Sequence, residues 1–131
     1  MASPTRLGTT SGTTAGSTGG GSALAIQQGF GAVIEQTLPS VVEIDTASGL
    51  GSGVILDTGG DIVTNAHVVG SATSFTVLLA NSTRGYPAKL VGVYRPDDLA
   101  VIKVSGTAPL RPAHFADSSR IKVGDVVLAM G

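Results

Sequence analysis

Short β-rich runs separated by turn residues fill the chain from Ser40 to its end, and this pattern restricts the possible fold more than any other feature. Gly, Pro, Asn, Asp and Ser punctuate the runs, as in proteins built of many short strands. No intervening segment is long enough for the helical crossover of a parallel sheet. The chain is therefore predicted to be an all-β sandwich or barrel, with strands at Val41–Thr46, Gly53–Leu56, Asp61–Thr64, Ser74–Leu79, Ala88–Tyr94, Leu99–Val104 and Asp125–Met130.

Two different segments precede the strands. Residues 1–22 consist almost entirely of Gly, Thr, Ser and Ala, which bury too little surface to offset the entropy of ordering, and this predicts a disordered linker. In residues 23–39, apolar residues recur at helical spacing up to Pro39, and Ser22 is suited to cap the helix. Two glycines inside this helix cost about 1 kcal/mol each relative to Ala, so we expect it to depend on packing against something else. Residues 40–131 then form the β-domain.

Composition excludes several classes of function. The net charge is −1 and the eight Lys and Arg residues are scattered, so no basic face for nucleic acid is predicted. Cysteine is absent and the two histidines, His67 and His114, lie far apart, so we expect neither a metal site nor a cofactor. No apolar run approaches the roughly 20 residues of a membrane span. Without the apolar core of a secretory signal, either the protein is cytoplasmic or an export segment lies outside this sequence.

Two polar residues beside apolar strands are candidates for chemistry. His67 follows the run Ile62–Thr64, and Asp98 precedes Leu99–Val104. Taken singly, a structural histidine and a turn-capping aspartate are the simpler interpretations. Asp97 could form an acid–base pair with Asp98, but successive strand residues point to opposite faces, so we assign Asp97 to the solvent side of the turn.

Taken together, these segments resemble the HtrA/Deg serine proteases. The resemblance rests on Gly51–Ile55 (GSGVI), Thr64–Val69 (TNAHVV) and Asp98–Val104 (DLAVIKV), in that order. Leu38–Val42 (LPSVV), Val123–Asp125 (VGD) and Ala129–Gly131 (AMG) also resemble the family, so the similarity runs from about Leu38 to Gly131. It implies the first Greek-key β-barrel of the trypsin-like fold, preceded here by a short helix.

The resemblance also implies that the catalytic residues are divided between two barrels. His67 matches the family's general base, and Asp98 matches the carboxylate that orients it. The family's nucleophile lies in a Gly-Asn-Ser-Gly-Gly segment of the second barrel, and these 131 residues contain no such segment. We therefore expect the chain to be truncated before that barrel and to be inactive alone. The expected partners are polypeptide substrates, the missing second barrel and further copies of the chain.

Ser52, in the glycine-rich stretch Gly49–Gly53, superficially resembles a nucleophile elbow. The required strand–turn–helix is missing around it, so we do not assign it as the nucleophile. The stretch also lacks the third glycine of a dinucleotide fingerprint and the lysine of a phosphate-binding loop. We expect these glycines to serve local packing.

Two functions remain open at this stage. The first is a serine endopeptidase that cleaves exposed or unfolded polypeptide, located outside the cytoplasm, with the Gly/Thr/Ser segment as a linker to a membrane anchor. The alternative is a non-catalytic barrel that binds peptides or a partner. In either case, an uncovered barrel flank and the final strand Asp125–Met130 predict self-association, unless the N-terminal helix folds back over that flank.

Overall fold

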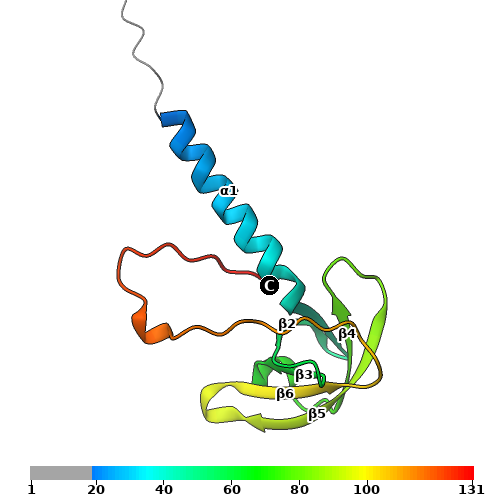
Figure 1. Ribbon diagram of the computed structural model, residues 1–131. Coiled ribbons are helices and arrows are strands. Elements are labelled where there is room, and N and C mark those ends of the chain that lie inside the picture. The colour runs from blue at the N-terminus through cyan, green and yellow to red at the C-terminus, as the bar shows by residue number, and fades with distance from the viewer. Residues whose placement is uncertain (1–18) are drawn as a thin grey trace, which may run out of the picture.

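The computed structural model describes residues 19–131 and contains a closed, six-stranded antiparallel β-barrel with one long helix on its N-terminal side (Figure 1). The linker predicted for residues 1–22 lies outside the described residues, except for its last four residues, which are helical. The strands are β1 (Val41–Thr46), β2 (Gly49–Ile55), β3 (Asp61–Thr64), β4 (Ser74–Leu79), β5 (Gly85–Tyr94) and β6 (Leu99–Val104). The bounds of β1, β3, β4 and β6 are those predicted from the sequence.

The barrel has Greek-key connectivity. β1, β2 and β3 pair in sequence, and β4 then returns to pair with β1, so the closed order is β1-β2-β3-β6-β5-β4. Alternate residues of each strand point inward, which follows from the two-residue repeat of a strand. These inward side chains form one core together with Val69, which lies in the segment after β3. The strand residues of the core are Val42, Ile44, Ile55, Ile62, Phe75, Val77, Tyr86, Ala88, Ala100, Ile102 and Val104. The prediction of an all-β Greek-key barrel is confirmed.

The glycine-rich stretch lies on strand β2, and its glycines make room for neighbouring side chains. A Cβ at Gly53 would lie 2.7 Å from Ile62 Cγ2 and 2.8 Å from Ile44 Cδ1, inside the barrel. A Cβ at Gly51 would overlap the side chain of Val68. These glycines therefore let the strand approach the core residues and the segment that follows β3.

The predicted strand Asp125–Met130 is wrong. Residues 105–131 contain one short 3₁₀ turn, η3 (Ser118–Arg120), and no strand. The barrel is already closed by pairing of β1 with β4, so no strand edge remains free for a seventh strand. The segment instead forms a long loop whose end returns to the neighbourhood of β2 (Figure 1). Val123, Val126 and Val127 are highly exposed along it.

The N-terminal helix, α1 (Gly19–Thr37), begins four residues before the predicted start and leads into a 3₁₀ turn, η1 (Leu38–Ser40). It projects away from the barrel (Figure 1). Its large apolar side chains are exposed: Leu24, Ile26, Phe30, Val33 and Ile34. The alternative that it folds back over the barrel is therefore wrong for the described residues. The expectation that the helix depends on packing against something else stays a prediction. No helix in this part of the chain is long and apolar enough to cross a membrane.

Candidate active site

Sheet register brings the two candidate residues together. β3 pairs antiparallel with β6, and Thr64 at the end of β3 lies opposite Ala100 near the start of β6. The residues that follow β3 and those that precede β6 therefore meet at the same rim of the barrel. His67 lies in the first of these segments and Asp98 in the second.

His67 is held outward by a short helix, α2 (Ala66–Val69). Ala66 and Val69 are buried on its inner side, whereas the His67 side chain is 73% exposed. The helix is too short to be stable alone, so its buried residues and its contacts with Asp98 fix its position. The imidazole thus faces solvent from a backbone that is anchored in the core.

Asp98 follows a 3₁₀ turn, η2 (Arg95–Asp97), and adopts a left-handed conformation with φ 53° and ψ 42°. Asp is one of the few residues that tolerate this conformation. The left-handed conformation directs both the main-chain carbonyl and the carboxylate of Asp98 toward α2. The carbonyl accepts hydrogen bonds from Ala66 N at 3.0 Å and Asn65 Nδ2 at 3.0 Å.

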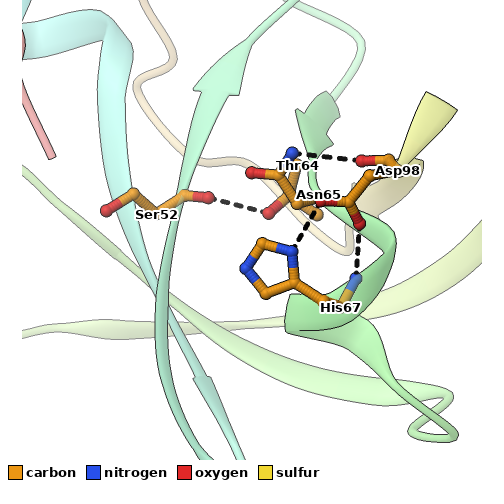
Figure 2. A network of polar contacts seen from close by, with 5 residues as sticks. All are labelled: Ser52, Thr64, Asn65, His67 and Asp98. Carbon is orange, nitrogen blue, oxygen red and sulfur yellow. Dashed lines mark hydrogen bonds and ion pairs between the residues drawn. The ribbon is translucent and has the colours of Figure 1, made fainter.

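The carboxylate of Asp98 binds His67 through both oxygens (Figure 2). Oδ1 accepts from the His67 main-chain N–H at 2.9 Å, and Oδ2 lies 2.6 Å from His67 Nδ1. The two side chains therefore lie within hydrogen-bonding reach of each other. Because Nδ1 faces the carboxylate, Nε2 is the imidazole nitrogen left to act on another molecule.

The hydrogen bond from the His67 main chain, followed by the one from its side chain, holds the pKa of Asp98 below its ordinary value. Both bonds favour the charged carboxylate. Asp98 therefore remains ionised at neutral pH. A carboxylate must be ionised to stabilise a neighbouring imidazolium.

Acid should weaken this part of the fold. Because the folded-state pKa of Asp98 is depressed, its contribution to stability is complete above the unfolded-state value and is lost as pH falls through the folded-state pKa. We expect Asp98→Asn to flatten the decline in melting temperature below about pH 4. Thermal melts from neutral to strongly acidic pH measure this, with Asp97→Asn as the matched control. A slope in Asp98→Asn equal to that of the unsubstituted chain would contradict the expectation.

The other candidates do not join the pair. Asp97 is exposed in η2, as predicted, and His114 is exposed in the C-terminal loop. The Ser52 hydroxyl points away from the imidazole, whereas its main-chain carbonyl accepts a 2.7 Å hydrogen bond from Thr64 Oγ1 (Figure 2). Ser52 is therefore a strand residue and not a partner of His67. No cluster of metal-binding side chains occurs within residues 19–131.

Two residues of the site were not singled out from the sequence. Thr64 and Asn65 figured there only as part of the motif around His67, although Asn before a short helix is a recognised signal for a polar contact at that position. In the structure, Asn65 caps no main-chain group of α2 and instead donates to Asp98 O. Its partner lies 33 residues away, so no local pattern could have identified it.

A closed Greek-key barrel with a His–Asp pair on its rim has the architecture of a trypsin-like catalytic barrel. The family model of the trypsin-like peptidase domain matches residues 51–131, and the chain therefore belongs to that family.

Within the family, the chain is similar to the HtrA/Deg serine proteases, which confirms the resemblance seen in the sequence. It is 42% identical over 83 residues to the periplasmic serine endoprotease DegP of Escherichia coli, covering 63% of this chain and 17% of DegP. It is 43% identical over 90 residues to the serine protease Do-like HtrA of Bacillus subtilis, covering 66% of this chain and 20% of that protein. A DegP-like protein of Rickettsia conorii is 42% identical over 82 residues, covering 63% of this chain and 16% of that protein. The matched region is thus at most about a fifth of these relatives.

Proposed function

We propose that this chain is the first barrel of an HtrA-type serine endopeptidase, with His67 as general base and Asp98 as the carboxylate that orients it. The observation that carries the proposal is the 2.6 Å contact between His67 Nδ1 and Asp98 Oδ2. In this arrangement His67 Nε2 removes the proton from a serine hydroxyl as that oxygen attacks the peptide carbonyl. Nε2 then returns the proton to the leaving amine.

The serine and the oxyanion hole would come from a second barrel. Ser52 helps to line two hollows, with volumes of about 560 Å³ and about 300 Å³. The smaller one is lined by Thr64 and Asn65, next to the His–Asp pair, and also by Leu99 and Met130. Apolar side chains that line a hollow beside an exposed imidazole support a docking surface for the other half of a catalytic cleft.

The experiment that tests this function compares the chain alone with the chain continued by the second barrel of the Bacillus subtilis relative. The chain alone is expected to hydrolyse neither casein nor peptide esters, because it supplies a base without the nucleophile. The joined protein is expected to hydrolyse both. If a folded joined protein shows no turnover, the function is wrong and a peptide-binding barrel takes its place. Turnover by the chain alone that is abolished by His67→Ala would contradict the expectation that these 131 residues lack the nucleophile.

The proposed substrates are polypeptides, since the relatives are endoproteases. Several of these relatives are named periplasmic, and we propose the same extracytoplasmic setting for this chain. Tethering to a membrane through the N-terminal segment stays a prediction.

We also propose that copies of the chain associate. The apolar side chains of α1 are exposed, as are Val126 and Val127 in the C-terminal loop, and exposed apolar surface of this kind favours association. The mean mass from light scattering should therefore rise with concentration. Val126→Asp with Val127→Asp, or removal of residues 1–37, should each reduce the rise. A constant monomer mass at high micromolar concentration would contradict the proposal.

A further inference from the structure

The two segments that carry His67 and Asp98 are joined at both ends of α2. All the bonds described so far lie at the N-terminal end of this helix, on Asn65, Ala66 and His67. At its C-terminal end, Arg95 Nη2 donates a 3.0 Å hydrogen bond to the carbonyl oxygen of Gly70. Among residues 19–131, this is the hydrogen bond that fastens that end of α2 to the turn before Asp98.

The carbonyl of Gly70 reaches Arg95 because of an unusual turn. Gly70 has φ 55° and ψ −117°, close to the first central position of a type II′ turn. The turn is closed by a 2.8 Å hydrogen bond from Ala72 N to Val69 O. A side chain is disfavoured at this φ, so glycine is needed to direct the carbonyl outward toward the guanidinium.

Arg95 also contacts Asp98 directly, because its main-chain carbonyl accepts a 3.0 Å hydrogen bond from Asp98 N. A closed ring of bonds results. It runs from His67 to Asp98, from Asp98 N to Arg95 O, from the Arg95 side chain to Gly70, and from Gly70 N back to Ala66 O at 2.9 Å.

We propose that Arg95 is a positioning residue for the His–Asp pair, acting through Gly70. Without its side chain, no hydrogen bond within the described part of the chain holds the C-terminal end of α2 to the Asp98 turn, and only the packing of Val69 in the core resists movement there. His67 would then spend more time away from Asp98. The catalytic meaning of this role rests on the proposed function, but the positioning itself is a property of the barrel.

The test uses the 131-residue chain and NMR measurements that do not depend on proteolysis. Arg95→Ala should lower the hydrogen-exchange protection of the His67 main-chain N–H by roughly fivefold, the size expected for losing one typical hydrogen bond. The signal of the imidazole Nδ1–H should weaken in parallel. Arg95→Lys keeps one donor within reach of the carbonyl and should restore most of the protection.

Arg84→Ala is the matched control, because it removes the same charge from a side chain whose guanidinium lies 5.1 Å from the centre of the Tyr86 ring. It should leave the His67 signals unchanged. Gly70→Ala with Arg95 retained should reproduce the loss, and the double variant should show little further loss because both changes break the same bond.

Three results would overturn the proposal. The first is unchanged protection of the His67 N–H in Arg95→Ala. The second is an equal loss in Arg84→Ala, which would indicate an effect of net charge. The third is a uniform loss across the barrel with a lower melting temperature, which would make Arg95 a general stabilising residue. None of these depends on the second barrel, so failure here and failure of the proposed protease function remain distinguishable.

Discussion

Asp98→Asn is expected to lower kcat about 10⁴-fold in a protein that joins this barrel to a serine-bearing second barrel. The size of this loss follows from the hydrogen bonds that the two carboxylate oxygens of Asp98 make. Oδ1 accepts from the His67 main-chain N–H, so the amide oxygen of Asn takes that place and its NH₂ group faces His67 Nδ1. An NH₂ donor makes Nδ1 the acceptor and puts the imidazole proton on Nε2. The nitrogen that should accept the serine proton is then occupied.

Steady-state kinetics on a short peptide measure this effect, and KM should change little because Asp98 contacts the Nδ1 side of the imidazole and not Nε2. His67→Ala should cost at least as much, and the double variant should cost no more than His67→Ala, since the two residues act as one unit. Asp97→Asn is the control and should keep kcat near that of the unsubstituted protein. A loss smaller than about tenfold in Asp98→Asn would contradict the assigned role.

The barrel strands could be predicted because their sequence signals are local. Four strands have the predicted bounds, since segments rich in turn residues, such as Asp57–Gly60, Asn81–Gly85 and Arg95–Asp97, separate the β-rich runs. The run Asp125–Met130 carries the same local signal but forms no strand. A strand also needs a partner edge, and the closing pairs between β1 and β4 leave none on this barrel. Local pattern cannot reveal whether an edge is available.

The N-terminal helix α1 shows that a local pattern also cannot reveal what an element packs against. The spacing of Ile26, Phe30 and Val33 predicted a helix correctly, but not where its apolar side would lie. Those side chains are exposed, so periodicity identified the element without identifying its partner.

For the candidate site, resemblance supplied the pair and the fold supplied its geometry. His67 and Asp98 are 31 residues apart, and only the pairing of β3 with β6 brings them to one rim. The left-handed backbone of Asp98 and the hydrogen bond from Arg95 to Gly70 depend on that same pairing. No local sequence pattern specifies either of them, so neither could be predicted from the sequence.

The pair also depends on the core beneath it, which makes a core substitution the second large effect. Ile44 is fully buried on β1, with Gly51 of β2 and Val77 of β4 as its neighbours in the sheet. Its Cδ1 atom fills the space left by the missing side chain of Gly53. Glycines cannot rearrange to refill a cavity, so truncation here should leave one open.

We therefore expect Ile44→Ala to cost about 4 kcal/mol, in the upper part of the range for large-to-small changes in a core. Urea unfolding of the chain followed by circular dichroism measures it, with the midpoint expected to fall by about 2 M. Leu50→Ala on β2 is the matched control, since its side chain is 69% exposed and should cost less than about 0.5 kcal/mol. A cost below about 1 kcal/mol for Ile44→Ala would mean that the barrel collapses around the cavity. In that case the close approach of β1 and β2 at Gly53 would not be what maintains the shape of the barrel. The rim that carries His67 and Asp98 would then not depend on that approach either.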